Sequence, residues 1–218
     1  YSYTEYRLAR EFANLQASGR AQTTSLGVSY PFIRSRQANL TGSAQVQNKR
    51  FYDQQQAVNV QQSRASDSAV LALNFDRRDN TGISYGQLEW AFGRLAGPQP
   101  DLGRTNGRFT RVNADVVRLQ RLNNTLSLFL RVNAQKAGQN LDSSESYSLG
   151  GPYAIRAYAT GEGTGDEGML GQLELRYQHS AQLSPYVFFD AGHSRTEHKK
   201  TAPGKNSRSL SGAGVGVR

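Results

Sequence analysis

Two segments of this sequence carry residues that could form a strong electrostatic contact. The segment Leu149–Gly168 is too rich in glycine for a regular helix or strand, yet it places Arg156 between apolar and aromatic neighbours. Farther along, Asp190 stands in the middle of the strand-like run Phe188–Gly192. A guanidinium and a carboxylate shielded from water form a bidentate, charge-assisted pair, which could hold a long loop against a wall. Residue types alone favour the alternative, in which Arg156 is solvated and Asp190 faces a lysine of a neighbouring strand.

Other groupings of reactive residue types are poor candidates for catalysis or ligand binding. Gly163–Gly168 matches G-x-G-x-x-G, but a dinucleotide site needs a preceding strand and a following helix, and here a polar segment precedes and a strand-like run follows. His193, Glu197 and His198 lie in a lysine-rich segment without a further metal ligand nearby. Glu162, Asp166 and Glu167 have no nucleophile beside them, and no G-x-S-x-G or H-E-x-x-H motif occurs. We therefore expect no enzyme, no cofactor and no metal site.

The elements that must position these residues are strands. In Leu126–Asn133, apolar residues alternate with polar ones, with Phe129 as the exception on the polar face. Similar runs recur along the chain and are separated by clusters of Gly, Pro, Asn, Asp and Ser. We predict an all-β chain with strands near 1–9, 21–30, 39–52, 66–76, 82–93, 109–118, 125–135, 169–178, 184–192 and 208–217. No helix is well supported, because the one apolar run at helical spacing, Arg118–Leu122, is too short.

One face of these strands is apolar and the other is charged. The charged face includes Gln45, Gln47, Lys49, Gln172, Glu174 and Arg176, which are costly to bury without water. The mean hydropathy is −0.64, and no run approaches the roughly 18 consecutive apolar residues of a transmembrane helix. An antiparallel β-barrel with an apolar outside and a watered lumen fits this pattern. Tyrosines near strand ends fit aromatic girdles of a barrel, or equally the general preference of tyrosine for strands.

The predicted connections alternate in length, as barrel connections do. Pro31–Ala38, Leu122–Asn124 and Ser180–Ser184 are short, whereas Asp53–Arg64, Gly97–Arg108, Lys136–Gly168 and His193–Ser207 are long and polar. We expect the short set in the periplasm and the long set outside the cell. In the last strand Gly212, Gly214 and Gly216 alternate, which fits either close approach of another segment or strand curvature.

The net charge, the lack of cysteine and the chain ends limit the classes of protein to which this sequence can belong. The net charge is +9, but the 26 Lys and Arg are spread along the chain, so a charged lumen explains them as well as nucleic acid would. Absence of cysteine excludes disulfides and thiolate metal sites. The chain starts at Tyr1 without a signal peptide and stops at Arg218 directly after a strand, so we expect a fragment of a longer protein.

The arginine and aspartate segments, in this order, resemble the signature motifs of two-partner secretion transporters. Ile155-Arg156-Ala157-Tyr158 is similar to the Val-Arg-Gly-Tyr-type tip of the sixth extracellular loop in that family, and Phe188, Asp190 and Gly192 match its Phe-x-Asp-x-Gly wall motif. Ile155 replaces valine, and Ala157 replaces glycine, which restricts φ at the loop tip. The flanking residues Gly150, Gly151, Gly165, Asp166 and Gly168 agree with the family as loop supports. The resemblance extends from about residue 20 to the end and favours the haemolysin and haemagglutinin branch.

The resemblance implies a fold and a function. It implies that residues 1–218 are part of a C-terminal transmembrane β-barrel domain, with about ten strands of a probable sixteen and a loop folded inward at about 136–168, where Arg156 reaches Asp190. The implied protein lies in the bacterial outer membrane and passes a large unfolded haemolysin, adhesin or contact-dependent toxin to the cell surface without ATP. Its partners would be that exoprotein, outer-membrane lipid and periplasmic modules of the same full-length chain. An insertase-like barrel, a passive porin and a soluble basic β-sandwich that binds nucleic acid are the alternatives.

Overall fold

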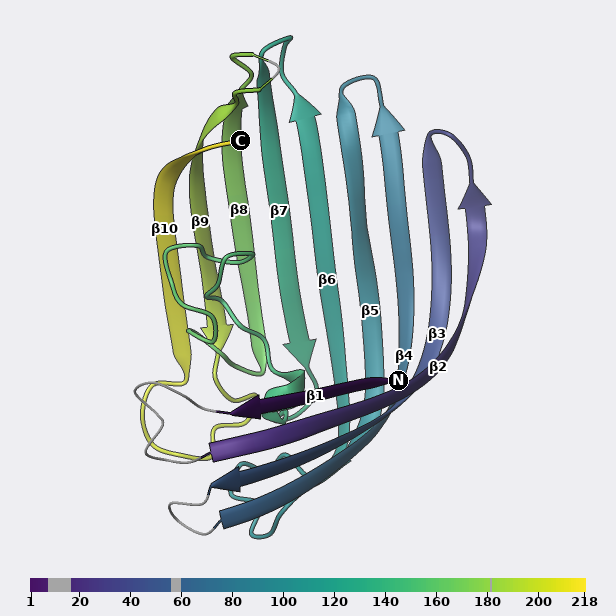
Figure 1. Ribbon diagram of the computed structural model, residues 1–218, viewed down its shortest axis with the longest axis vertical. Coiled ribbons are helices and arrows are strands. Elements are labelled where there is room, and N and C mark those ends of the chain that lie inside the picture. Colours follow the sequence, from purple (N-terminus) through teal and green to yellow (C-terminus); the bar gives the residue numbers. More distant parts are fainter. Residues whose placement is uncertain (8–16, 56–59, 181) are drawn as a thin grey trace.

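The computed structural model describes residues 1–7, 17–55, 60–180 and 182–218. Its strands form one antiparallel sheet in which each strand pairs with the next along the chain (Figure 1). The strands are β1 Ser2–Arg7, β2 Ala17–Arg34, β3 Ala38–Gln55, β4 Val60–Asp79, β5 Gly82–Ala96, β6 Gly107–Arg121, β7 Leu126–Ala137, β8 Glu167–Tyr177, β9 Pro185–Arg195 and β10 Ser207–Val217. The prediction of an all-β chain with ten strands is confirmed.

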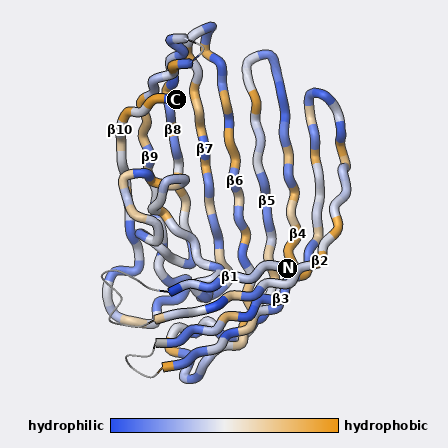
Figure 2. Tube along the Cα trace, in the orientation of Figure 1, coloured by the Kyte–Doolittle hydropathy of each residue, from blue (hydrophilic) through white to orange (hydrophobic). Residues whose placement is uncertain are grey.

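The sheet curls, and its two faces differ in polarity. Large apolar side chains on the convex face are exposed, among them Leu26, Val28, Val46, Leu71, Phe92, Val116, Val132, Leu173, Val187 and Val215. The concave face carries the polar and charged residues between them, and apolar and polar positions alternate along most strands in Figure 2. Alternation on every strand is what places one residue set on each side of the sheet. The described residues contain no helix long and apolar enough to cross a membrane.

The connections lie at two opposite ends of the sheet according to their length (Figure 1). Short turns join β2 to β3, β4 to β5, β6 to β7 and β8 to β9, whereas long connections follow β5, β7 and β9. The short turns are closed by side chains: Asp79 Oδ1 accepts hydrogen bonds from the backbone N–H groups of Thr81 (2.8 Å) and Gly82 (2.9 Å). From β4 to β10, short and long connections therefore alternate as predicted.

Two predicted connections are wrong at their boundaries. Most of the predicted long loop Asp53–Arg64 is strand, because β3 continues to Gln55 and β4 begins at Val60; residues 56–59 lie outside the described part. The predicted short loop Pro31–Ala38 also begins too early, since β2 continues to Arg34 with a register shift between Pro31 and Ile33. Proline has no backbone N–H to donate, so it is tolerated where the hydrogen-bond ladder is irregular. Residues 8 and 9 of the predicted first strand lie outside the described residues.

The connection between β7 and β8 contributes to both buried apolar clusters of the described residues. It lies against the concave face of β8, β9 and β10 and contains a single 3₁₀ turn at Ser143–Glu145 (Figure 1). Its apolar residues form a buried cluster with one residue each from β8 and β10: Tyr147, Leu149, Ile155, Leu170 and Leu210. A second cluster at the foot of the connection joins Phe109, Ala137 and Leu141. We call the connection Gly138–Asp166 the inward loop.

Candidate functional site

Arg156 at the tip of the inward loop reaches Asp190 on β9. Arg156 Nε donates to Asp190 Oδ2 at 2.8 Å, and Arg156 Nη2 donates to Oδ1 at 2.6 Å. The backbone N–H of Arg156 donates a third hydrogen bond to Oδ2 at 3.2 Å. The Asp190 side chain is fully buried, and the Arg156 side chain is 18 % exposed. Both carboxylate oxygens are therefore used, in the fork geometry that makes such pairs strong.

Glu174 on β8 gives Arg156 a second carboxylate. Arg156 Nη1 donates to Glu174 Oε1, and Arg176 Nη2 donates to Glu174 Oε2 at 2.6 Å. The Arg156 guanidinium also lies 3.8 Å from the ring centroid of Phe188, a cation–π contact. The sequence prediction treated Glu174 only as a lining residue, because nothing in its local sequence shows that a distant loop supplies it with an arginine.

A second arginine–ring contact lies on the same wall, nearer the short turns. Arg176 lies over the ring of Phe129, with 4.7 Å between the guanidinium carbon and the ring centroid. Phe129 was the exception to the alternation on β7, and its contact with Arg176 explains why an aromatic ring lies on the polar face. Arg156 and Arg176 thus each have an aromatic ring beneath the guanidinium and a carboxylate beside it.

The neighbours of Arg156 in the loop motif hold the tip in position. Ile155 is fully buried in the cluster with Leu149, and its backbone N–H donates to the carbonyl of Leu149 at 2.8 Å. Tyr158 packs against the same cluster and is partly buried. Among the described residues Arg104 is the one non-glycine residue with positive φ, so Ala157 adopts a backbone conformation that alanine accepts. Alanine in place of glycine therefore introduces no strain at the tip.

The glycines named as loop supports lie where other groups come close. Gly151 has φ +135°, a conformation that side chains disfavour. The other glycines lie in crowded places. A Cβ atom would meet backbone or ring atoms at Gly150, Gly165, Gly168 and Gly192. Asp166 accepts a hydrogen bond from the backbone N–H of His198 at 2.8 Å, which ties the inward loop to the connection after β9. Burial raises the pKa of Asp166 above its usual 3.8, although this hydrogen bond opposes the shift.

The foot of the inward loop is held by ion pairs with strands far away in the sequence. Glu145 pairs with Lys49 on β3 at 2.6 Å and with Arg111 on β6 at 2.8 Å. Asp142 pairs with Arg64 on β4 at 2.6 Å. Burial tends to raise the pKa of Asp142, but hydrogen bonds from Ser144 and Arg64 outweigh it and leave that pKa below 3.8. The sequence prediction missed this foot, since it depends on where the loop folds.

Between the foot and the tip of the inward loop, side chains of the wall donate hydrogen bonds to the backbone of the loop. Gln172 Nε2 donates to the carbonyl of Ala154 at 2.7 Å. Arg131 Nη1 donates to the carbonyl of Tyr153 at 2.7 Å, while its other nitrogens bind Asp115. Gln135 Nε2 donates to the carbonyls of Glu145 (2.9 Å) and Asp166 (3.0 Å). The acceptors are backbone carbonyls, which every residue carries. No sequence motif therefore indicates these contacts.

The other groupings considered from the sequence have their side chains paired with different residues. His193 Nδ1 lies 2.9 Å from Ser209 Oγ, whereas His198 Nδ1 lies 2.8 Å from Glu167 Oε1. Glu197 instead accepts a hydrogen bond from the hydroxyl of Thr201 at 2.7 Å. Within the described residues no three side chains of metal-ligand type come together. The glycine run Gly163–Gly168 leads directly into β8 rather than into a helix.

The site as a whole is an electrostatic and apolar clamp on a long loop. Its contacts are ion pairs, hydrogen bonds and a small apolar cluster, all reversible and none covalent. The carboxylate Asp190 has Arg156 as its ion-pair partner, so release of the loop tip removes this partner and its hydrogen bonds, which water must then replace. Such a clamp strongly favours the docked loop and makes its release costly.

Comparison with known proteins gives a consistent assignment. A family model described as "Haemolysin secretion/activation protein ShlB/FhaC/HecB" matches residues 1–218. The chain is 27% identical over 232 residues to the heme/hemopexin transporter protein HuxB of Haemophilus influenzae (strain 86-028NP), covering 99% of this chain and 41% of that protein. It therefore spans about two-fifths of the length of this relative.

Solved structures agree in fold. CdiB from Escherichia coli superimposes with a TM-score of 0.78 at 19% identity, covering 92% of this chain and 39% of that chain. CdiB from Acinetobacter baumannii superimposes with a TM-score of 0.69 at 15% identity, covering 98% of this chain and 39% of that chain. The predicted family and the predicted location are thereby confirmed. The chain belongs to the haemolysin secretion/activation protein family ShlB/FhaC/HecB, the two-partner secretion transporters of the bacterial outer membrane.

Proposed function

We propose that this chain forms much of the wall of a pore that passes a large unfolded exoprotein from the periplasm to the cell surface. Family membership supports export of a secreted partner, and the related HuxB is named a heme/hemopexin transporter. The exoprotein of this chain would be a haemolysin, an adhesin or a contact-dependent toxin. Transport would need no ATP, because folding of the exoprotein outside the cell would draw it outward. The protein would act as a conduit and would catalyse no reaction.

The observation that carries this proposal is the inward loop, clamped to the concave wall through Arg156 and Asp190. A loop that occupies the inner side of a barrel must be held firmly to keep the pore organised. It must also be able to shift if a polypeptide is to pass. Charged contacts in a watered lumen satisfy both needs, since water can replace them when the loop moves. The arginine–aspartate pair would therefore set the position of the loop before and after transport.

The concave face also suits a moving polypeptide. It offers many hydrogen-bonding side chains, including Gln45, Gln47, Lys49 and Gln87, and few apolar groups outside the clusters that hold the loop. An unfolded chain would make weak and exchangeable contacts with such a surface. A strongly apolar lumen would bind the exoprotein and stop it.

We further propose how the described sheet belongs to the whole protein. Residues 1–218 would be part of the C-terminal barrel domain, in which further strands close the open edges at β1 and β10. The short turns would face the periplasm, and the long connections would face outward. Periplasmic modules of the same full-length chain would receive the exoprotein, and outer-membrane lipid would surround the convex face.

The test is a secretion assay with the full-length protein and its exoprotein. Arg156→Asp and Asp190→Arg are each expected to abolish most export while the barrel still assembles in the membrane. The exchanged pair should restore part of it. Because Glu174 also accepts a hydrogen bond from Arg156, an aspartate at position 156 would face a second carboxylate. The exchange is therefore made both alone and together with Glu174→Gln, which should improve the restoration.

A matched control is the exposed ion pair of Arg208 and Glu162, which joins the same loop to β10 at 2.7 Å. Its reversal should leave export unchanged, because exposed pairs contribute little. Normal export by both single variants would contradict the proposal. In that case, impaired assembly of other outer-membrane proteins would favour an insertase, and a steady wide conductance would favour a porin.

A further inference from the structure

The convex face of β2–β6 carries a group of arginines directly beside its apolar surface. Leu26, Val46, Ala69 and Phe92 are cross-strand neighbours and form one apolar row over four strands. Two residues farther toward the long connections, the equivalent row is Thr24, Asn48, Asp67, Arg94 and Arg108. Arg50 and Arg20 follow on β3 and β2. We call Arg20, Arg50, Arg94 and Arg108 the outer basic patch.

The outer basic patch has too few acidic partners. Among the described residues, no carboxylate oxygen lies within 4.0 Å of a guanidinium nitrogen of these arginines, the distance that defines the ion pairs elsewhere in the protein. Two carboxylates are near in register, Asp67 opposite Arg94 and Glu5 opposite Arg20. Asp67 accepts a hydrogen bond from Asn48 (2.6 Å), and Glu5 accepts one from Tyr3. Four arginines against two carboxylates leave an excess of positive charge.

Arg94 and Arg108 make this excess costly. They lie directly opposite each other on β5 and β6 and project from the same face. Like charges that are directly opposite across two strands destabilise a sheet unless an anion lies between them. Both side chains are exposed on the convex face.

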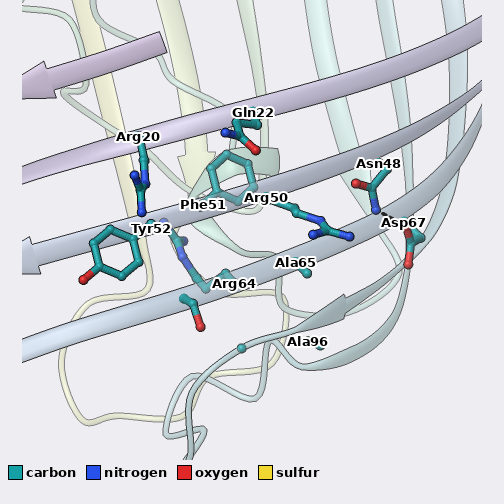
Figure 3. A pocket seen from close by; sticks show the side chains of 12 residues that line it. Arg20, Gln22, Asn48, Arg50, Phe51, Tyr52, Arg64, Ala65, Asp67 and Ala96 are labelled. Atoms are coloured by element: carbon teal, nitrogen blue, oxygen red, sulfur yellow. Dashed lines mark hydrogen bonds between the residues drawn. The ribbon is translucent and has the colours of Figure 1, made fainter. Parts of the chain in front are cut away.

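Two adjoining pockets give this face the form of a lipid site. Arg20 and Arg50 line one of them, and Arg94 lies beside both as the cross-strand partner of Asp67, followed by Arg108. A polar pocket of about 750 Å³ lies among Arg20, Arg50, Tyr52 and Asp67, with Arg20 over the ring of Tyr52 at 4.8 Å (Figure 3). An apolar groove of about 510 Å³ shares Asn48 and Asp67 with it. The groove continues along the row of Leu26, Val46, Ala69 and Phe92. Polar pocket and apolar groove therefore meet end to end on the convex face, the face proposed above to contact lipid.

We infer that the outer basic patch binds a phosphorylated lipid of the surrounding membrane. The arginines would bind the phosphate, in the fork geometry that suits this group. An acyl chain would lie in the apolar groove. The boundary between an apolar membrane surface and the adjoining polar surface is where headgroup phosphates lie, and basic side chains there attract anionic lipids. A soluble acidic protein or free phosphate would leave the apolar groove unused. The inference depends on the membrane location of the sheet and not on export.

The test measures lipid binding by the purified full-length protein, with diphosphoryl lipid A and its dephosphorylated form as probes in native mass spectrometry. The wild-type protein should retain diphosphoryl lipid A and should lose most of the dephosphorylated lipid. Arg94→Gln with Arg108→Gln should weaken binding about thirty-fold, from a factor of about five for each arginine near a membrane surface. The matched control changes two exposed arginines at the short-turn end, Arg36→Gln and Arg78→Gln, and should bind like wild type.

A companion variant separates loss of binding from loss of folding. Arg94→Lys with Arg108→Lys keeps both charges, so it should bind at least several-fold better than the glutamine variant. If the glutamine variant does not assemble, the single variant Arg94→Gln replaces it, with about fivefold weaker binding expected. Equal binding of the dephosphorylated lipid would overturn the inference. So would equal binding by wild type and the arginine variants, whatever their export activity.

Discussion

Ala157 occupies the space that a side chain at Gly212 would need. A Cβ atom on Gly212 would lie 2.6 Å from the Cβ of Ala157, so the loop tip and β10 are in contact only because residue 212 is a glycine. Gly212 is also the cross-strand partner of Asp190. The tip of the inward loop is thus held on two neighbouring strands, by charge on β9 and by close packing on β10.

A larger residue at position 212 should displace the loop tip. Gly212→Val places a branched side chain where Ala157 lies, and overpacking of this kind typically costs about 1–3 kcal/mol. We expect faster protease cleavage near the exposed Tyr153 and a weaker Arg156–Asp190 contact. Limited proteolysis of the assembled full-length protein in detergent measures this release.

Gly171→Val is the matched control, because a Cβ at Gly171 meets its nearest neighbour only at 4.0 Å. It should leave the cleavage rate of the loop unchanged. The further variant Gly212→Val with Ala157→Gly should recover part of the protection, since it removes the methyl group that collides. Equal cleavage of Gly212→Val and wild type would show that the tip does not depend on this contact.

The two carboxylates that bind Arg156 should differ in importance. Asp190→Asn weakens three hydrogen bonds from Arg156 and removes one of the two carboxylates that pair with its mostly buried guanidinium, which we expect to cost about 3–5 kcal/mol of loop docking. Glu174→Gln replaces a charged acceptor of Arg156 by a neutral one, and Asp190 remains in place, so about 1.5–3 kcal/mol is expected. The rates of loop cleavage in the two variants, and in the double variant, measure both costs and their coupling. A larger effect for Glu174→Gln would contradict this order.

Much of the fold could be predicted from the sequence because alternation is a local property. All ten strands are visible as alternating runs, and the apolar members of each run mark the convex face. Strand ends were less evident: β3 continues past Tyr52 and β4 begins before Ser66, so Gln54 and Gln61 belong to strands although no alternating apolar run marks them. Hydropathy locates the membrane-facing part of a strand, whereas backbone pairing fixes its length.

The site was only partly predictable for a related reason. Arg156 and Asp190 were named because their motifs resemble those of a family, and geometry now places them together. The roles of Glu145 and Glu174 depend on which distant strand each one meets, and a single sequence does not contain that information. Their sequence neighbours are ordinary serines and leucines. Only a folded loop shows that they are anchors.

Docking of the inward loop should depend on pH with two opposing contributions. The pKa of Asp142 lies below 3.8, so its charged form stabilises the docked loop, and this stabilisation is lost as the pH falls through that lowered pKa. The pKa of Asp166 lies above 3.8, so its contribution is present at low pH and is lost as the pH rises through the raised pKa. Docking should therefore be strongest between the two pKa values, and cleavage with an acid-active and a neutral protease measures it.

Asparagine variants separate these contributions. Asp166→Asn keeps an acceptor for the N–H of His198 but cannot ionise, so it should remove the loss of docking on the neutral side. Asp142→Asn should remove the loss on the acid side and weaken docking at neutral pH, because Arg64 loses a charged partner. The same pH profile in both variants would mean that other groups control the loop.

A charge should be tolerated on one face of β4 and not on the other. Leu73 is the cross-strand neighbour of Gly42 and Leu88 in the middle of the apolar convex face, while the next residue, Asn74, is the neighbour of Thr41 and Gln87 on the concave face. Leu73→Arg should destabilise the barrel by about 2–4 kcal/mol, the cost of an arginine on the lipid face of a β-barrel near the bilayer midplane. Asn74→Arg should cost little, since its side chain reaches water. The temperature at which the full-length protein loses its compact mobility in unheated gels measures both, and equal loss in the two variants would mean that the convex face does not contact lipid at this depth.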